Sequence, residues 1–305
     1  MAKPVTVFSG VLGLNNREHP SRLEADERGN VELAEAVNID ISGRGKPRRR
    51  KGQRASAITQ GCHSFFVAGD TGYCVSGSKL LRVTPDFVTS ALRFDLTPDL
   101  RMSFCAQAGK LFYANGQENG YIEAGSSHAW DLPQTDWQAV DSARSFSAPP
   151  VGHKLAAAFG RVWIAQDNVL WFTEPYAPFF CDLARNAIPF PTRVREIVPV
   201  QDGLFVSTMR QTVFLAGGDP RQMRQIDIRP EPLIPGTAVV AAPEDIGYDQ
   251  VPQGILVVAT MPSGICLLGS GGFCVNLTAQ RVVLPGKYSE GAAYMYNGKY
   301  VVSLR

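Results

Sequence analysis

The sequence predicts an all-β protein, a β-propeller of about five to seven blades, on three observations. The 305 residues include 29 Gly and 21 Pro, a density of helix breakers that favours short strands over long helices. Hydrophobic residues make up 45% of the chain and charged residues 19%, which is a globular composition. A strand–turn–strand unit also recurs, at a spacing close to the roughly 40–50 residues of a propeller blade.

The recurring unit is an apolar and aromatic strand, a polar turn with Gly or Asn, and a second strand. Its six copies begin at Gly72, Gly109, Gly160, Gly203, Gly264 and Ala293. Side chains alternate in each copy, as Val162 and Ile164 do before the turn and Val169 and Trp171 after it. This period of two predicts strands with one buried face. Segments between the hairpins, such as residues 195–200, supply the other strands. A set of β-sandwich domains is the competing architecture.

We expect residues 1–35 to form an extended N-terminal arm and residues 36–305 a single propeller-like domain. A Pro-rich insertion is expected near 229–253, where 25 residues hold five prolines. Because the last hairpin reaches Arg305, a strand from elsewhere in the chain must close the ring. Residues 36–41 alternate well and are the candidate for that strand.

The six cysteines have no C-x-x-C spacing and sit mostly in apolar runs. They are expected to be buried reduced thiols, with Cys105, Cys266 and Cys274 as the clearest cases. Cross-strand disulfides between Cys62 and Cys74 and between Cys266 and Cys274 are the alternative. Apolar runs are far shorter than the roughly 20 residues of a membrane span, so no membrane insertion is expected.

Enzyme motifs are absent from the sequence: it holds no G-x-S-x-G elbow, Walker loop, H-E-x-x-H or EF-hand pattern. We therefore predict no enzyme activity, no catalytic residue, no cofactor and no metal. A propeller glycoside hydrolase remains an alternative, because two carboxylates at strand ends can form its site. The acidic residues in such places are Glu174, Asp182, Asp202, Asp219 and Asp227. Asp also forms turns, which explains these positions without chemistry.

The densest local charge lies between residues 44 and 54, where seven of eleven residues are cationic. They are Arg44, Lys46, Arg48, Arg49, Arg50, Lys51 and Arg54. Interspersed Gly and Pro favour an extended or turning segment over a helix. Crowded cations repel one another unless an anionic surface faces them. Three interpretations stay open: a solvated loop, contact with an acidic neighbouring subunit, and contact with a DNA backbone.

Aromatic residues in expected loops offer a second kind of surface, for recognition of a glycan or other receptor. The candidates are Trp130, Trp137, Tyr176 and Phe179. Sugars stack on aromatic rings, so exposed rings on loops would support such a role.

Several blocks of the sequence follow a recognisable order: 13–16 (GLNN), Pro20, Leu23, 36–40 (AVNID), 49–52 (RRKG), 161–178 and 197–217. In this order they resemble bacteriophage tail proteins of the nozzle, hub or DNA-stabilisation type. The resemblance implies a β-propeller, no cofactor, and a place among other tail proteins in the virion, assembled in the host cytoplasm. It also implies a homo-oligomeric ring of three-fold or six-fold symmetry. The chain is short for a nozzle, so a tail-tip or baseplate component is equally compatible.

Overall fold

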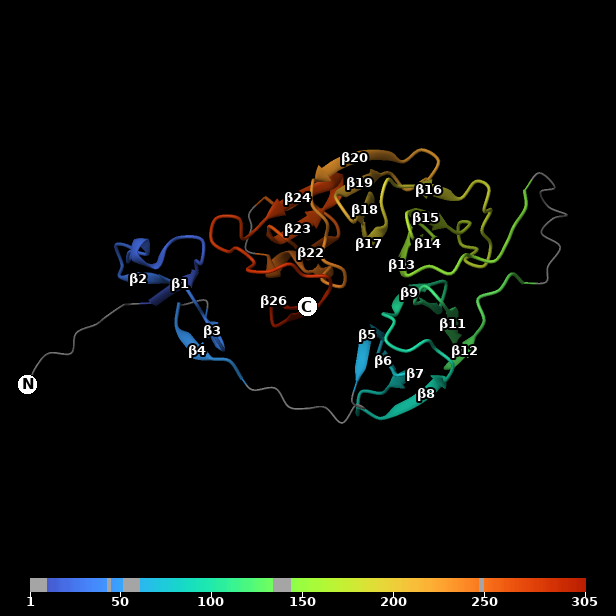
Figure 1. Cartoon of the computed structure of the whole chain (residues 1–305), viewed down its shortest axis with the longest axis horizontal. Coiled ribbons are helices and arrows are strands. Elements are labelled where there is room, and N and C mark those ends of the chain that lie inside the picture. The colour runs from blue at the N-terminus through green and yellow to red at the C-terminus, as the bar shows by residue number, and fades with distance from the viewer. Residues whose placement is uncertain (1–9, 43–44, 52–60, 134–143, 247–249) are drawn as a thin grey trace, which may run out of the picture.

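A computed structural model describes residues 10–42, 45–51, 61–133, 144–246 and 250–305. It is built almost wholly from β-strands (Figure 1). The 3-10 helices η1 (Pro20–Arg22), η3 (Pro243–Asp245) and η4 (Ser270–Gly272) span three residues each. No helix among the described residues is long and apolar enough to cross a bilayer.

Five four-stranded antiparallel sheets follow one another along the chain, and we call them blades 1 to 5. Blade 1 holds β5 (Cys62–Ala68), β6 (Thr71–Ser76), β7 (Lys79–Val83) and β8 (Thr89–Arg93). Blade 2 holds β9 (Ser103–Gln107), β10 (Lys110–Ala114), β11 (Asn119–Glu123) and β12 (Ser126–His128). Blade 3 holds β13 (Lys154–Ala158), β14 (Arg161–Gln166), β15 (Val169–Phe172) and β16 (Ala187–Pro189).

Blade 4 holds β17 (Val194–Val200), β18 (Gly203–Thr208), β19 (Thr212–Ala216) and β20 (Arg224–Arg229). Blade 5 holds β21 (Val239–Ala241), β22 (Leu256–Met261), β23 (Gly264–Gly269) and β24 (Phe273–Asn276). A two-stranded sheet, the terminal hairpin, follows with β25 (Gly291–Tyr296) and β26 (Lys299–Leu304). The first strands of blades 1 to 4 contact one another in succession, and β21 of blade 5 contacts β25, so these strands line the axis.

Two-residue turns join the first strand to the second in blades 2 and 3, at the start of two predicted units, and close the last predicted hairpin. Ala108 and Gly109, Phe159 and Gly160, and Asn297 and Gly298 each have positive φ at both positions. Such type I′ turns match the right-handed twist of the strands that they join. The strand–turn–strand pattern therefore marks the places where the chain reverses within a blade.

The second strands of the blades are buried on both faces, whereas the alternation predicted one buried face. Val162, Trp163, Ile164 and Ala165 of β14 are all fully buried. Trp163 packs between blades 3 and 4, and Ile164 packs between blades 2 and 3. The prediction of one buried face is wrong here because each blade is covered by a neighbour on either side.

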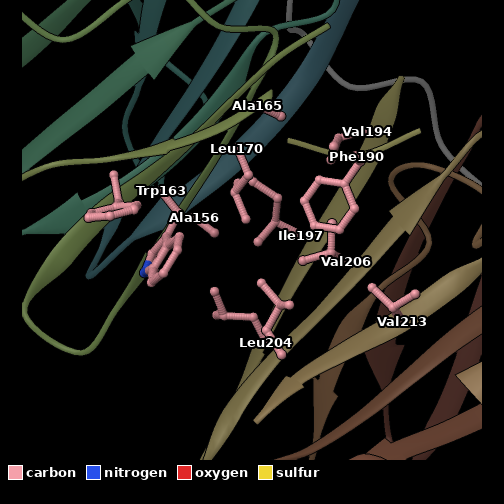
Figure 2. Close-up of a cluster of buried hydrophobic side chains, with 12 residues drawn as sticks. Ala156, Trp163, Ala165, Leu170, Phe190, Val194, Ile197, Leu204, Val206 and Val213 are labelled. Carbon is pink, nitrogen blue, oxygen red and sulfur yellow. The ribbon is translucent and has the colours of Figure 1, made fainter. Parts of the chain in front are cut away.

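A hydrophobic core fills each junction between successive blades. Figure 2 shows the junction of blades 3 and 4, where Trp163 and Leu170 face Ile197, Leu204 and Val206. Blades 1 and 2, 2 and 3, and 4 and 5 share similar clusters. Met295 and Tyr300 of the terminal hairpin pack on blade 5. The remaining cluster, around Cys74, belongs to blade 1 alone, so no core joins blade 1 to the terminal hairpin among the described residues.

The N-terminal module comprises β1 (Gly10–Leu14), β2 (Asn30–Leu33), β3 (Ile39–Ile41) and β4 (Pro47–Arg49). The first two pair in parallel and the last two antiparallel, and none joins a blade. Figure 1 shows the module outside the propeller. The expectation that residues 36–41 close the ring is therefore wrong, because β3 pairs only with β4 among the residues that the structure describes.

The Pro-rich segment 229–253 is more than an insertion. It contains β21, the first strand of blade 5, and Leu233 and Ile234 within it are buried. Prolines lie on both sides of this strand, which explains why the sequence pattern predicted an insertion rather than part of a blade. Of the cysteines, Cys105 and Cys266 are buried as predicted, while Cys274 is half-buried. All six are free thiols, although the Sγ atoms of Cys62 and Cys74 lie 3.7 Å apart.

Candidate functional site

The predicted cationic run forms a hairpin outside the propeller, made of β3 and β4, which we call the basic hairpin. Lys46, Arg48, Arg49, Arg50 and Lys51 are all exposed on it. Arg44 and Arg54, the other two predicted contact residues, lie outside the described residues. Five of the seven cations thus lie on β4 or within two residues of its ends, and β3 and β4 lie outside the propeller (Figure 1).

A tight turn and a contact with β1 hold the basic hairpin in place. Ser42 N donates to Lys46 O at 3.0 Å, and Gly45, with a φ of 70°, reverses the chain. Val11 N in β1 donates to Gly45 O at 2.7 Å. A Cβ on Gly45 would lie 3.0 Å from Val11 O, so only glycine fits this approach. The hairpin is therefore anchored to the module at its turn.

Charge on the basic hairpin is almost uncompensated. Its single carboxylate, Asp40, pairs with Arg50 at 3.2 Å and lies directly across the strands from Arg48. Both partners of the ion pair are exposed, with 57% and 39% of their side chains accessible. An exposed pair of this kind contributes at most about 1 kcal/mol. The surface is therefore free to meet an anionic partner.

The predicted aromatic surface does not form as expected. Trp130 is only 2% exposed: it packs against Phe112, and its Nε1 donates to Pro178 O at 2.9 Å. Phe179 is partly buried against the same Phe112. The interpretation of these two rings as exposed is wrong, because they fill the outer edge of the junction between blades 2 and 3. Tyr176 is 80% exposed, and Trp137 lies outside the described residues.

A polar cluster at the axis is the second site, and we call it the axial cluster. Arg101 precedes β9 and reaches the other side of the axis, where it donates to Gly291 O at 2.8 Å and pairs with Glu290 at 3.5 Å. Arg195 of β17 donates to Ser289 O. These contacts link the first strands of blades 2 and 4 with the terminal hairpin.

A buried ion pair forms the base of this cluster. Glu196 of β17 is 1% exposed and pairs with Lys154 of β13. Its Oε2 also accepts a hydrogen bond from Gly236 N at 2.8 Å, in the loop before β21. One carboxylate thus joins blades 3, 4 and 5 at the axis. Because both oxygens are occupied, its role in this arrangement is to hold the blades together.

His63 lies at the edge of the axial cluster, on β5. A bulge there places Ser64 at a φ of 55°, with its Oγ 3.0 Å from His63 Nδ1. Ser64 Oγ also accepts from Met102 N at 2.9 Å. Burial lowers the pKa of His63, with nearby Arg101 acting in the same direction and Asp99 opposing it. Its buried Nε2 has no hydrogen-bond partner among the described residues.

The carboxylates considered for a glycosidase take structural positions. Glu174 and Asp182 both bind Arg144, and Asn186 donates to Glu174 at 2.7 Å. Although burial opposes it, the hydrogen bonds from Arg144 and Asn186 hold the pKa of Glu174 below its ordinary value. A general acid needs the opposite shift.

The remaining carboxylates of that set cap turns or lie on an outer strand. Asp202 accepts from Gly271 N at 2.9 Å, and Asp219 accepts from Arg221 N at 3.2 Å. Asp227 lies on the outermost strand of blade 4. Within the described ranges, no group of three potential ligands could hold a metal ion.

Sequence reasoning missed the axial cluster. Arg101, Arg195 and Glu290 stand within the first residues of a blade's first strand or just before it. In a propeller these positions converge on the axis, so the three residues could have been found from the sequence once the starts of the blades were known. The hairpin repeats marked the second strands instead, and the first strands went largely unassigned.

No protein-family model matches the chain, and no curated protein matches it. Solved structures do. A streptogramin B lyase structure aligns with a TM-score of 0.51 and 11% identity, over 87% of this chain and 83% of that chain. BBS1N in complex with ARL6DN aligns with a TM-score of 0.50 and 10% identity, over 77% and 71%. The WD40 β-propeller domain of Doa1 aligns at 0.44 and 8%, over 72% and 69%. Such identities carry the fold alone: the chain is an all-β protein whose repeated four-stranded antiparallel sheets match β-propeller structures.

Proposed function

We propose that the protein is a non-enzymatic structural component of a bacteriophage tail, as a nozzle, hub or tail-tip and baseplate subunit in a symmetric assembly. The observation that carries the proposal is the basic hairpin, held outside the propeller with five exposed cations and one carboxylate. The resemblance of residues 13–52 to tail proteins supports the same role, since the hairpin lies inside that block.

The positive charge of the basic hairpin favours an anionic partner. Exposed like charges crowded on two three-residue strands repel one another, and an opposing anionic surface relieves that repulsion. We expect this surface to be an acidic face of a neighbouring tail subunit. The residues that pack the propeller are elsewhere, so the hairpin can serve assembly without contributing to the core.

The test is a quadruple substitution of Arg48, Arg49, Arg50 and Lys51 by Ser in the phage that carries the gene. Folding of the isolated chain should change by less than about 1 kcal/mol, because exposed charges contribute little. Particle yield should fall by about tenfold or more, and further as ionic strength rises, because salt screens the remaining attraction.

A matched control separates the effect of charge at the basic hairpin from the effect of the net charge of the chain. Four exposed cations elsewhere, Arg28, Arg210, Arg221 and Arg224, are replaced by Ser for the same change in net charge. Particles should form normally in this control. Normal particles from the first variant, or absence of the chain from purified virions, would refute the proposal. Salt-dependent DNA binding by the wild-type chain that the first variant loses would instead identify a DNA partner.

A further inference from the structure

The terminal hairpin is half a blade. Blades 1 to 5 each have four strands, whereas β25 and β26 form a two-stranded sheet. β25 takes the axial position, since it contacts β21 of blade 5. The two outer strands are therefore the missing ones, and β26 offers a six-residue edge without a strand partner among the described residues. Such an edge is a template for another strand.

A hollow marks the place where those outer strands would lie. It has a volume of about 710 Å³ and is lined by Val258, Ile265 and Val275 of blade 5, Tyr300 of β26, Asp245, and the mostly polar segment 276–281 with Arg281 at its end. On the opposite face of blade 5, the outer strand β20 of blade 4 covers the sheet with Ile226 and Ile228. The side of blade 5 that faces the terminal hairpin lacks this cover.

The strands of the basic hairpin are as short as the shortest outermost strands, and one face of the hairpin carries two isoleucines beside Pro47 and Arg49. β3 and β4 are three residues long, as are the outermost strands β12 and β16. Ile39 lies opposite Arg49 and Ile41 opposite Pro47, and opposed residues share a face of the sheet. Ile39 and Ile41 are only half-buried, and the adjacent Val37 is 67% exposed. Neither isoleucine belongs to a hydrophobic cluster among the described residues.

We propose that the basic hairpin of a second copy of this chain completes the terminal hairpin, with β3 pairing along β26 and its Ile39–Ile41 face filling the hollow on blade 5. The result is a four-stranded sheet like the other five. Two charged side chains line the hollow, Arg281, which is paired with Glu32, and Asp245. Asp245 lies at the hollow against the β25–β26 turn, where a Cβ on Gly298 would be 2.9 Å from its Oδ1. It has no ion pair among the described residues and meets the cations of β4.

The chain's own hairpin is held away from this position. Asn16 N donates to Arg281 O at 3.0 Å, Asn16 Nδ2 donates to Val283 O at 2.9 Å, and Glu32 pairs with Arg281 at 3.3 Å. These contacts fix the module at the rim of the hollow while the hollow stays open. The contact of Val11 with Gly45 then ties the basic hairpin to that module. Donation from a second copy needs none of these contacts to break in the receiving chain.

Strand donation of this kind is heterologous, because each copy gives one surface and receives another. Repeated from copy to copy, it builds a ring where the rotation closes and an open filament where it does not. The inference stands on the strands and the hollow, and it does not depend on the proposed place in a tail.

The test asks whether a disulfide forms between two full-length variants, which carry tags of different size so that the mixed dimer can be identified. One carries Ile41→Cys and the other Val302→Cys, which lies on the same face of β26 as Tyr300, and the two are mixed under a mild oxidant. A disulfide between them can form only between copies. We expect linked dimers at about tenfold or more above a control in which Arg28→Cys, exposed on the same module, replaces Ile41→Cys. Both mixtures carry the same six native thiols, so any background is shared.

Sedimentation of the unmodified chain supplies the second readout. Its average mass should rise with concentration, and Ile39→Ser with Ile41→Ser should weaken association by about tenfold or more. Val88→Ser with Phe94→Ser, which removes exposed apolar side chains from blade 1 and its edge, should leave association unchanged. Three results would overturn the proposal. They are a wild-type chain that stays monomeric at every concentration, disulfide linking no greater than in the Arg28→Cys control, and a disulfide within one chain when both engineered cysteines are placed in the same chain. Because the isolated chain is used, such a failure would leave the tail assignment to the particle experiment.

Discussion

Replacing Glu196 by Ala should lower the free energy of unfolding by about 4 kcal/mol, because it removes a buried charge that three blades share. The Glu196 side chain is 2% exposed and the Lys154 side chain 25%. Without the carboxylate, Lys154 keeps a mostly buried ammonium, and Gly236 N loses its acceptor. The loss therefore has two parts that different substitutions can separate.

The magnitude follows from those two parts. Breaking a buried pair costs about 3–5 kcal/mol, and the partial exposure of Lys154 places its share near the lower limit. A buried amide left without an acceptor costs about 1–3 kcal/mol. Glu196→Gln keeps an acceptor for Gly236, so it should cost about 1–2 kcal/mol less than Glu196→Ala. Adding Lys154→Met to Glu196→Ala should recover more than about 1 kcal/mol, because no unpaired charge remains.

Urea unfolding followed by circular dichroism measures these differences, with the slope against urea checked for constancy. The order expected is wild type, Glu196→Gln, the double variant, then Glu196→Ala, with the middle two close together. A loss below about 1 kcal/mol for Glu196→Ala at unchanged slope would refute the reasoning. It would show that water reaches the axis and screens the pair.

Three other predictions concern single groups. Burial lowers the pKa of His153, whose Nε2 lies 2.7 Å from Val194 O; its contribution to stability is present above about pH 6.5 and is lost as the pH falls toward the lowered value. Urea midpoints should drop between pH 7 and 5, and less steeply in His153→Gln. Burial raises the pKa of Cys105 and of Cys181 to about 12, so thiol reagents at pH 8 should leave both unlabelled until denaturant is added, and fast native labelling would contradict this. Gly203→Ala should cost at least about 2 kcal/mol, since its Cβ would lie 2.4 Å from Leu215 O; a thermal midpoint within a degree of wild type would exclude the clash.

Hairpins were predictable from the sequence because their turns have a local cause. In the last hairpin, for example, Asn297 and Gly298 have positive φ, and the residues on either side mark the two strands. Residues 195–200 were also predicted as a strand, which matches β17, whereas β13 was not assigned. No local pattern shows that Lys154 of β13 and Glu196 of β17 are neighbours at the axis. Their meeting depends on the radial order of blades, which only the assembled fold supplies.

Exposure was predicted less well than strand placement. Trp130 follows the short outer strand β12 in polar sequence, which is typical of a loop, yet Phe112 and the Pro178 carbonyl enclose it. That pocket comes from residues 18 and 48 positions away, beyond any local window. The basic run was read correctly as exposed and non-helical at Lys46 and at Arg48 to Lys51, because crowded charge is seldom buried.

Among the described residues no hydrophobic core joins blade 1 to the terminal hairpin, so the stack of sheets has two free ends. In such a stack each sheet is stabilised by its nearest neighbours, so blades 2 to 5 have support on both sides and blade 1 on one. Thermal fluctuation then opens the molecule from its ends, with β14 and β18 the last to exchange their amide protons with solvent. Arg101 opposes that fraying, since it ties the start of blade 2 to Pro235 and Gly291 on the far side of the gap. Because no neighbouring sheet bridges this gap, the hydrogen bonds of the Arg101 guanidinium connect the two ends of the stack of sheets.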